Sequence, residues 1–599
     1  MLLVIQQLLQ QALKNAIQKQ LLPGFSVASL SNKDKREIPL SLISVEISDK
    51  EEFGDYNSNL PFKITKLSNV APEKVGSILT SELRQIPQGN NFFSQIEATK
   101  GYINFYLSPD YLLQSLQTIL RQRDRYGYVI PKTGRNLVID YSSPNIAKSF
   151  GIGHLRSTVI GQALYNLYSY RGWKCIGDNH LGDWGTQFGI LIYQINKLIE
   201  GKNRRDQKEI LQNLTIKDLE RMYVEFHKQL EENPQLKEQA KEWFRRLEKR
   251  EKKALQIWKL CLSLSLREFN RIYKLLSIKF DYSIGESFYS RKARILLREI
   301  QKKGLAKKSE GALIMEFPDS NLPPALLLKS DGSTTYFLRD LAAVKYRLKK
   351  WHPKMIIYEV GADQSLHFRQ LFQAVKLLKW DEVKLVHIAH GLIRDKEGKF
   401  STRLGRTISL EKVLNEAIRK SEELMEKSET KRRLSCSEKK EIAHAIGIGG
   451  IKYNILSYHY SKDIIFDWEK ILNLQGNSGP YLQYTYVRCY SIIQKAQKEG
   501  VRLGKLKKGI SLNKDEIALL RTLVKFPDVV QVAAEKFAPN LLCDYLYNLS
   551  SLYNYFYQQF PILKAPEEDR SKRVQLTLAT SYILRRGFYL LGMPVISKM

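Results

Sequence analysis

The chain has 599 residues, of which 95 are Lys or Arg and 62 are Asp or Glu, giving a formal net charge of +33. This length exceeds what one hydrophobic core supports, so we expect three or four domains, and the hydrophobic share of 43% excludes a chain that is disordered throughout. The positive charge indicates either a polyanionic partner such as a nucleic acid or a host that uses Lys and Arg heavily, and both interpretations stay open.

The cysteines and the apolar segments narrow the class of protein further. The five cysteines are Cys175, Cys261, Cys436, Cys489 and Cys543. No two are close enough for a metal-ligand pair, and their scatter fits a reducing cytosol better than a disulfide framework. Residues 1–17 have the pattern of an amphipathic helix and not of a signal peptide, and no run of about 18 apolar residues exists to span a bilayer. We expect a cytoplasmic protein without a membrane segment or a metal site.

The first 107 residues predict a small α+β domain. An opening helix is followed by short β-like runs at 38–48 and 102–108. Pro109 and the polar helical stretch after it predict a linker to the next domain.

Between Asn136 and Thr407 the pattern changes to strands that alternate with helices. Strands are predicted at 136–142, 354–361 and 383–391, and helices at 154–170 and 364–378. This alternation is typical of a parallel, doubly wound sheet. Residues 192–330 interrupt it, and because 204–260 are charged and helical we interpret this stretch as an insertion between two halves of the sheet.

The last part of the chain, 436–599, has helical periodicity almost throughout, and its many aromatic residues predict the core of a helical bundle. The predicted fold is therefore multidomain α/β, with domains at 1–107, 108–435 and 436–599.

The segment YSSPNIAKSFGIGHLRST (141–158) carries the first candidate site. A strand ends, a loop turns at Gly151 and Gly153, and a helix begins near His154. Glycines let a flat ring or a phosphate approach the backbone, and a helix N-terminus offers unpaired N–H groups and partial positive charge. His154 and Lys148 add donors. The alternative is an ordinary tight turn between a strand and a helix.

The segment GKFSTRLGRT (398–407) follows the last predicted strand, so the sheet topology places it at the same crevice. Its cations are Lys399, Arg403 and Arg406. A basic, glycine-punctuated loop suits a pyrophosphate leaving group, on which charge develops during the reaction. The alternative is a solvated basic loop without a ligand.

Two further segments contribute polar side chains to the predicted crevice. In DGSTTYFLRD (331–340), Tyr336 and Asp340 are four residues apart and share one face of the predicted helix. In EVGADQSLH (359–367), Gly361, Asp363 and Gln364 follow the carboxyl end of a strand, where open α/β sheets bind ligands. Taken singly, such acids are more often surface charges or helix caps.

Together these segments resemble class I aminoacyl-tRNA synthetases, and in particular the arginyl-tRNA synthetase family. SPNIAK before GIGHLRST is the most specific element. Further blocks that resemble the family stand in the family's order: LGDWGTQFG (181–189), FDYSIGESFY (280–289), YFLRDLAAVKYR (336–347), VGADQSLHFRQLF (360–372) and FDWEKILNLQGNSGPYLQY (466–484). The resemblance extends from GDYNSN (54–59) to LLGMPVISKM (590–599).

The resemblance implies a Rossmann-like class I catalytic domain with an insertion, a small α+β N-terminal domain that contacts the tRNA elbow, and an all-α C-terminal anticodon-binding bundle. It implies a ligase that activates L-arginine with ATP to arginyl-adenylate, releases pyrophosphate and transfers arginine to the 3′ end of tRNA(Arg). Mg²⁺ would accompany the ATP, the chain would act as a monomer, and bound tRNA would commonly be needed for the activation step.

The resemblance also implies residue roles. The ATP-binding positions are Gly151, Gly153, His154, Gly361 and Asp363. The arginine-binding positions are Ser143, Asn145, Glu286, Tyr336, Asp340 and Gln364. The catalytic positions are Lys148, His154, Lys399 and Arg403. The tRNA-binding positions are Tyr102, Asn104, Tyr484, Arg488 and Met599.

These roles are chemically consistent with the substrate. A guanidinium has five N–H donors in a planar fork, which two carboxylates and an amide can satisfy, while a tyrosine lies against its plane or donates a hydrogen bond. For Tyr102 and Asn104 the alternative is a core aromatic and an edge amide. For the C-terminal aromatics the alternative is packing inside the bundle.

Two departures from the family's signatures have consequences. Gly151 stands where the "HIGH" signature has its first His, so one contact to the ATP phosphates is missing, and Thr402 stands where "KMSKS" has its second Lys. We hypothesise that Lys148 and Arg403 together stabilise the leaving pyrophosphate. An alternative function, a non-catalytic tRNA-binding paralogue, is favoured by Gly151 alone. A different class I synthetase is disfavoured by the SPNIAK and YFLRD blocks.

Overall fold

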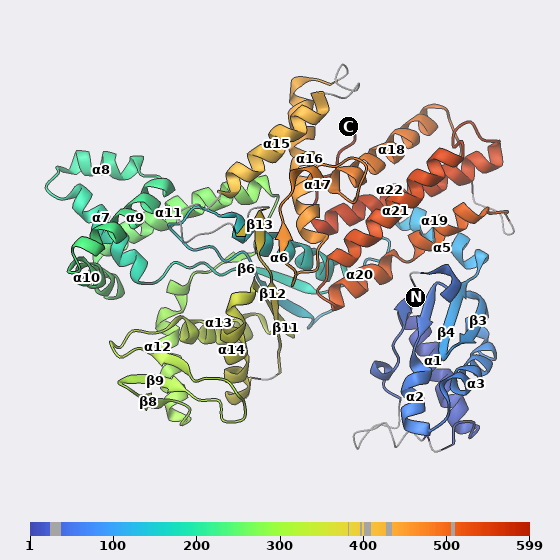
Figure 1. Cartoon of the computed structure of the whole chain (residues 1–599), viewed down its shortest axis with the longest axis horizontal. Coiled ribbons are helices and arrows are strands. Elements are labelled where there is room, and N and C mark those ends of the chain that lie inside the picture. The colour runs from blue at the N-terminus through green and yellow to red at the C-terminus, as the bar shows by residue number, and fades with distance from the viewer. Residues whose placement is uncertain are drawn as a thin grey trace.

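The computed structural model describes residues 1–23, 25, 38–48, 50–380, 382–395, 398–399, 409–426, 434–504 and 510–598. The chain forms a small N-terminal domain, a central α/β body with a helical extension, and a C-terminal bundle of helices (Figure 1). The small domain lies beneath the bundle, and the helical extension lies at the far end of the body.

The N-terminal domain is a four-stranded antiparallel sheet with helices packed on it, in the order β1-β2-β4-β3. Its strands are β1 (Glu46–Ile47), β2 (Tyr56–Ser58), β3 (Phe93–Thr99) and β4 (Tyr102–Leu107). Its helices are α1 (Leu2–Gln18), η2 (Leu40–Leu42), η3 (Glu51–Phe53), α2 (Leu60–Ser68), α3 (Pro72–Arg84) and α4 (Pro87–Asn90). The β-like run at 38–48 is therefore a strand only at its end.

The GDYNSN segment docks this domain onto the bundle. Tyr56 donates a hydrogen bond of 2.7 Å to Asp528, and Asp55 forms ion pairs of 3.5 Å with Arg521 and 3.3 Å with Lys525. Gly54 is required there, because it has φ +76° and a Cβ would lie 2.6 Å from a backbone carbonyl oxygen. The linker forms α5 (Pro109–Gln122) and η4 (Arg123–Arg125), which pack against the bundle.

The central sheet has five parallel strands in the order β12-β11-β5-β6-β7. They are β5 (Asn136–Asp140), β6 (Lys174–Asn179), β7 (Tyr282–Ser283), β11 (Met355–Gly361) and β12 (Lys384–His390). Its crossover helices are α6 (Ile152–Tyr170), α13 (Tyr336–Trp351), η5 (Ala362–Gln364) and α14 (Ser365–Leu377). Alternate residues of β5 face two different cores, so both faces of the sheet are buried, as parallel sheets require. The doubly wound prediction is confirmed.

The stretch between β6 and β11 contains a helical extension and a small subdomain. The helices of the extension are α7 (Thr186–Ile199), α8 (Arg204–Asn213), α9 (Ile216–Glu232), α10 (Leu236–Glu248) and α11 (Lys252–Leu275). The subdomain holds α12 (Glu286–Lys302) and an antiparallel sheet of β8 (Lys307–Ser309), β9 (Ala312–Met315) and β10 (Ala325–Leu328). Between them the chain returns to the main sheet as β7, so the interruption expected at 192–330 includes one of that sheet's own strands.

The C-terminal part is almost wholly helical, as predicted. Its helices are α15 (Leu410–Glu426), α16 (Cys436–Leu456), α17 (Trp468–Ile471), α18 (Gly479–Lys498), α19 (Lys514–Val524), α20 (Phe526–Glu535), α21 (Asn540–Gln559) and α22 (Glu567–Leu591). A small sheet of β13 (Ile393–Asp395), β14 (Gly398–Lys399) and β15 (Ile464–Ile465) joins the bundle to the body, through the parallel pair β13–β15. Within the described ranges, no helix is long and apolar enough to cross a membrane.

Candidate active site

A cavity of about 1430 Å³ opens at the carboxyl ends of the central strands. Asp140, His180, Glu359 and His390 reach it from or just after the ends of β5, β6, β11 and β12. The N-terminal turns of α6, α12 and α13 complete its floor, and α10 of the helical extension lines one side. This is the edge of an open α/β sheet at which ligands bind.

The N-terminus of α6 faces the cavity without a side-chain cap. Gly151 is the N-cap residue, in extended conformation (φ −85°, ψ 161°), and the helix begins at Ile152, two residues before the predicted start. Gly153 lines the cavity and has open space where a Cβ would stand. The partial positive charge of the helix N-terminus is therefore open to an anionic ligand.

His154 adds an imidazole to this helix terminus. Its Nδ1 is buried and has no hydrogen-bond partner within the described residues. Burial lowers its pKa, and the nearby Lys148 and His390 lower the pKa further, against a backbone interaction with Gly151 that raises it. A neutral imidazole with an unpaired nitrogen is suited to bind a ligand that enters the cavity.

The loop between β5 and α6 has a strained backbone. Ser142, Ser143 and Ala147 have φ of 71°, 42° and 63°, values that residues other than glycine rarely adopt. Side chains from distant segments hold it, because Ser143 N–H donates to Asn179 Oδ1 over 3.1 Å and Ala147 N–H donates to Ser265 Oγ over 2.9 Å. Strain of this kind is typical of functional sites.

A buried ion triad lies under this loop and positions Ser143. Ser143 Oγ donates to Asp140 Oδ1 over 2.9 Å, and Arg347 donates to Asp140 over 2.6 Å and to Asp178 over 2.8 Å. Burial lowers the pKa of Arg347, but the two carboxylates outweigh it and raise the pKa well above its ordinary value. Arg347 therefore keeps its charge, and the triad fixes Ser143 at the edge of the cavity.

Asn145 is held beside Gly182, with which it forms a parallel β-bridge. A Cβ on Gly182 would lie 2.2 Å from Asn145 Oδ1, so only glycine allows this approach. Both residues line the cavity. The close contact with the SPNIAK loop thus explains Gly182, the first glycine of the LGDWG block.

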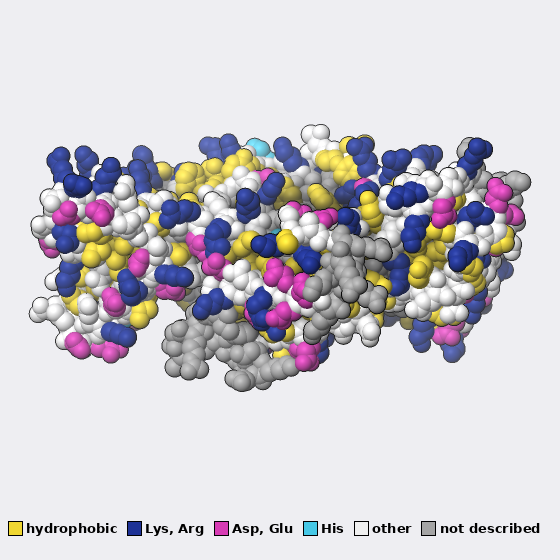
Figure 2. Space-filling model, turned by 90° about the horizontal axis from the view of Figure 1, so that it is seen from above, with side chains coloured by type: hydrophobic (Ala, Val, Ile, Leu, Met, Phe, Trp, Pro, Cys, Tyr) yellow, Lys and Arg dark blue, Asp and Glu magenta, His cyan; other side chains and the backbone are white. Residues whose placement is uncertain are grey.

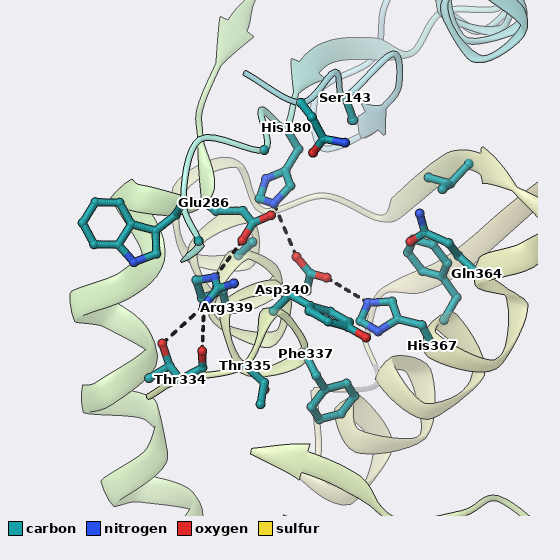
Figure 3. Close-up of a pocket in the computed structure, with 18 of the residues that line it drawn as sticks. Ser143, His180, Glu286, Thr334, Thr335, Phe337, Arg339, Asp340, Gln364 and His367 are labelled. Carbon is teal, nitrogen blue, oxygen red and sulfur yellow. Dashed lines mark hydrogen bonds and ion pairs between the residues drawn. The ribbon is translucent and has the colours of Figure 1, made fainter. Parts of the chain in front are cut away.

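Two carboxylates lie on the cavity floor, and basic side chains of the chain itself already contact both (Figure 3). Glu286, in the first turn of α12, accepts a hydrogen bond of 2.8 Å from Nε of Arg339, whose Nη1 donates over 2.8 Å to the carbonyl of Thr334. Burial raises the pKa of Glu286, and Arg339 opposes that shift.

Asp340 lies between two histidines, as Figure 3 shows. His367 Nε2 is hydrogen-bonded to Asp340 Oδ2 at 2.8 Å, whereas His180 Nε2 lies 3.4 Å from Oδ1 without hydrogen-bond alignment. Burial raises the pKa of Asp340, but the two imidazoles outweigh it and hold the pKa well below its ordinary range. Burial lowers the pKa of His180, but the Asp340 and Asp140 carboxylates raise it to about 9.

The remaining predicted arginine-binding residues surround the same floor. Tyr336 is 63% exposed, with its ring 5.5 Å from that of His367, and Gln364 ends η5 beside Gly361 and Asp363. Gly361 is closely approached, because a Cβ there would lie 2.5 Å from Asp363 Oδ1. All six positions assigned to arginine and four of the five assigned to ATP line one cavity; Gly151 is the fifth and pairs with Ser409 instead.

Among the predicted catalytic cations, Lys148 alone has a side chain within the described residues. Lys148 is exposed, does not line the cavity, and has its Nζ 5.8 Å from the ring of Tyr223 on α9. The side chain of Lys399 and the whole of Arg403 lie outside the described residues. The joint role of Lys148 and Arg403 stays a prediction.

The residues assigned to tRNA occupy different surroundings. Tyr102 is 44% exposed at the start of β4, with its ring edge-on to Phe62, so it is not a core aromatic. Asn104 is 1% exposed on a central strand, so it is not an edge amide and offers no surface to a macromolecule in this structure. Its side-chain atoms have no hydrogen-bond partner within the described residues.

In the bundle, Tyr484 is 41% exposed and Arg488 lies between two tyrosine rings. The guanidinium carbon is 4.8 Å from the ring centroid of Tyr484 and 4.6 Å from that of Tyr557. This cluster faces solvent and not the bundle core. Met599 lies outside the described residues.

Several residues that shape the site were not among the predicted site residues. They are Asp140, Asp178, His180, Arg339, Arg347, Glu359, His367 and His390. The available signal was position, because all of them except Asp178 lie inside or directly beside a quoted sequence block or a predicted strand. Their pairing could not be found, since the partners are far apart in the chain.

Three family models match consecutive parts of the chain. They are "Arginyl tRNA synthetase N terminal domain" at residues 4–107, "tRNA synthetases class I (R), catalytic domain" at residues 115–468 and "DALR anticodon binding domain" at residues 482–599. Together the three models cover nearly the whole sequence, one after another.

Curated proteins and solved structures agree with these matches. The chain is 36% identical to a protein named "Arginine--tRNA ligase" from Halothermothrix orenii, over 93% of this chain and 95% of that protein. It is 37% identical to a protein of the same name from Clostridium kluyveri, over 93% of this chain and 96% of that protein. The structure resembles arginyl-tRNA synthetase from Plasmodium falciparum, with a TM-score of 0.78 and 25% identity over 99% of each chain. It also resembles the enzyme from Thermus thermophilus, with a TM-score of 0.80 and 21% identity over 100% of each chain.

Proposed function

The chain belongs to the arginyl-tRNA synthetase family, and we propose that it is an arginine–tRNA ligase that uses ATP to join L-arginine to tRNA(Arg). One observation carries the proposal. The residues assigned to arginine and most of those assigned to ATP, which are distributed from Ser143 to Gln364 in the chain, line a single cavity at the carboxyl edge of the sheet. No finding favours the non-catalytic paralogue.

In the proposed complex, the guanidinium of the substrate lies on the floor between Glu286 and Asp340. The carboxylates and the Gln364 amide accept its N–H groups, and Tyr336 covers its plane. A lysine ammonium would leave part of this acceptor set unpaired, so discrimination needs no editing site. Ser143 and Asn145, on the strained loop, hold the amino-acid end of the substrate.

ATP would lie at the other end of the cavity, beside the N-terminus of α6. Gly153 lets the nucleotide approach the helix, His154 presents its unpaired Nδ1, and Gly361 with Asp363 borders the nucleotide on the β11 side. Within the described residues, no group of three His, Cys, Asp or Glu side chains could hold a metal ion. Mg²⁺ would accompany the ATP and would neutralise charge on its phosphates.

The proposed reaction has two steps. An oxygen of the arginine carboxylate attacks the α-phosphorus of ATP, and the bond to the β-phosphate breaks, giving arginyl-adenylate and pyrophosphate. The terminal ribose hydroxyl of the tRNA then attacks the arginyl carbonyl and AMP leaves. The chain contributes by positioning the reactants and stabilising developing charge. We assign the pyrophosphate contacts to Lys148, Lys399 and Arg403.

The tRNA would span the N-terminal domain and the helical bundle. Lys and Arg side chains are spread across the face shown in Figure 2 and outnumber the acidic ones there, which suits a phosphate backbone. We assign tRNA contacts to Tyr102, Tyr484 and Arg488, which are exposed or face solvent, and retain Met599 as a predicted contact; Asn104 is buried and is not assigned one. We place the chain in the cytoplasm as a monomer, in line with its five free cysteines.

An aminoacylation assay tests the proposal. The full chain, incubated with ATP, tRNA(Arg) and labelled arginine or lysine, should form acid-precipitable arginyl-tRNA and no lysyl-tRNA. Absence of arginyl-tRNA from a folded chain with intact tRNA would contradict it.

A further inference from the structure

The N-terminus of α6 lacks a side-chain donor at its cap position, because Gly151 has no side chain. In the first turn of this helix, His154 is therefore the residue whose side chain can donate a hydrogen bond into the cavity, beside the backbone amides. A second imidazole reaches the same cavity from a different element. His390, the last residue of β12, lines it and is 9% exposed.

His390 is fixed by a buried carboxylate. Its Nδ1 lies 3.0 Å from Oε1 of Glu359, whose side chain is completely buried. Because this hydrogen bond engages Nδ1, Nε2 is the free nitrogen, and it is directed towards Gly361, where a Cβ would lie 3.7 Å from it. Within the described residues no hydrogen bond uses Nε2. A ring held at one nitrogen by a carboxylate presents its other nitrogen in a defined direction.

The strand that carries Glu359 is bonded directly to α6. Ser157 Oγ, one turn after His154, donates a hydrogen bond of 2.7 Å to the carbonyl oxygen of Glu359. The same helix is tied to the chain after His390, because Arg156 donates to the carbonyl oxygens of Leu392 and Tyr460 over 3.4 and 2.8 Å. His390 therefore has a fixed place relative to the helix terminus, close enough to lower the pKa of His154.

We propose that His390 is an ATP-binding residue of this enzyme: as an imidazolium, it donates its Nδ1–H to Glu359 and its Nε2–H to a phosphate oxygen of ATP, and so takes the part that a side chain at position 151 would have. Glu359 is its positioning residue, acting through Nδ1. This inference rests on the proposed function. The contact stabilises charge as the bond between the α- and β-phosphates breaks, and no proton or electron changes place through it.

Two further histidines line the cavity, but neither is held as His390 is. His180 and His367 are occupied by Asp340 at the arginine end. His387, on the same strand, bonds the backbone oxygen of Val360 at 3.1 Å, packs 4.4 Å from the ring of Phe368 and does not line the cavity. His387 is therefore a matched control for a histidine on β12.

The experiment is pyrophosphate exchange by the full chain with arginine and tRNA(Arg), in the wild type and in the variants His390→Ala, His387→Ala and Glu359→Gln. Losing one donor to a charged group should lower kcat/KM for ATP about 10- to 100-fold in His390→Ala, with KM for arginine changed less than about twofold. Glu359→Gln should give a smaller loss of the same kind, and His387→Ala should match the wild type.

A double variant separates binding from a structural role. Gly151 has an extended backbone that any residue adopts, so Gly151→His introduces no backbone strain. In the background of His390→Ala it should restore kcat/KM for ATP at least about fivefold, because a donor returns to the same helix terminus. A loss that falls equally on arginine and ATP, or one that Gly151→His does not restore, would overturn the inference. So would His390→Ala kinetics equal to those of His387→Ala.

Failure of the proposed function gives a different result. In that case the wild type itself shows neither exchange nor arginyl-tRNA formation. An active wild type with an unaffected His390→Ala variant contradicts the role of His390 alone.

Discussion

Nε of Arg339 lies 2.8 Å from Oε2 of Glu286, so the chain places a guanidinium of its own against one of the two carboxylates assigned to the substrate's guanidinium. This ion pair is mostly buried, with 9% and 19% of the two side chains exposed. The charge of Glu286 is therefore already balanced. Asp340 contacts two imidazoles instead, which hold its pKa well below its ordinary range, so we expect it to remain a carboxylate and to accept the N–H groups of arginine.

Asp340→Asn should accordingly weaken arginine binding selectively. A hydrogen bond to a charged group contributes about 1.5–3 kcal/mol, so KM for arginine should rise roughly 10- to 150-fold while KM for ATP stays unchanged. Steady-state exchange kinetics measure both constants. Glu299→Gln is the control, since Glu299 is on α12 like Glu286 but pairs with Lys345 outside the cavity. Equal shifts in the two KM values would show that Asp340 supports the fold and not the substrate.

His180 should make stability depend on pH in the alkaline range. Its pKa of about 9 in the folded chain exceeds the ordinary value of about 6.5, so its contribution is complete below pH 6.5 and is lost as pH rises through 9. The loss is up to about 3 kcal/mol, at about 1.4 kcal/mol per pKa unit. Thermal melting of wild type and His180→Gln should differ most near pH 6 and converge above pH 9.

The exposed His352 provides the comparison for that experiment. It caps the C-terminus of α13 in the left-handed conformation, which Asn tolerates, so His352→Asn should melt in parallel with the wild type at every pH. If the difference between wild type and His180→Gln did not change with pH, the attraction between His180 and Asp340 would be refuted.

Tyr56→Phe should loosen the docking of the N-terminal domain. The hydroxyl donates to Asp528 on α20, and its removal leaves a buried carboxylate oxygen without that donor. A hydrogen bond to a charged group contributes about 2 kcal/mol, so KM for tRNA should rise at least about threefold as the docked population falls. KM for arginine should not change. Tyr128→Phe, at an exposed tyrosine, is the control, and equal KM values for tRNA in the two variants would count against the docking role.

The affinity for tRNA should fall steeply with salt if the net charge of +33 serves phosphate binding. Raising the salt concentration from about 50 to about 200 mM should weaken binding at least about 100-fold, because neutralised phosphates release their counterions. Filter binding over a salt series measures the slope. If the affinity for tRNA did not change with salt concentration, the basic composition would reflect the host's amino-acid usage and not phosphate binding.

The sequence predicted the elements that position the site better than it predicted the contacts within it. The strand at 136–142 and the glycines before His154 have strong local signals, so β5 and α6 were predicted. The start of α6 was predicted two residues late, because no capping side chain marks Ile152 as its first residue. β6 and the two-residue β7 were not among the predicted strands. Asp340 and His180 are 160 positions apart, and no local pattern indicates that they meet.

In the N-terminal domain, the burial of residues on a single strand could not be predicted from the sequence either. For Tyr102 and Asn104 the sequence left two interpretations open, contacts to tRNA or a core aromatic and an edge amide. Tyr102 is exposed because it begins β4, whereas Asn104 is covered at the centre of the sheet. Burial at the end of a strand depends on neighbours that the strand's own sequence does not specify.

The decisive measurement is pyrophosphate exchange with arginine, with and without tRNA(Arg) and with lysine and canavanine as competing substrates. We expect exchange with arginine in the presence of tRNA, and none with lysine, which cannot pair with Glu286, Asp340 and Gln364 together. A folded chain that binds tRNA tightly but shows no exchange under any of these conditions would contradict it.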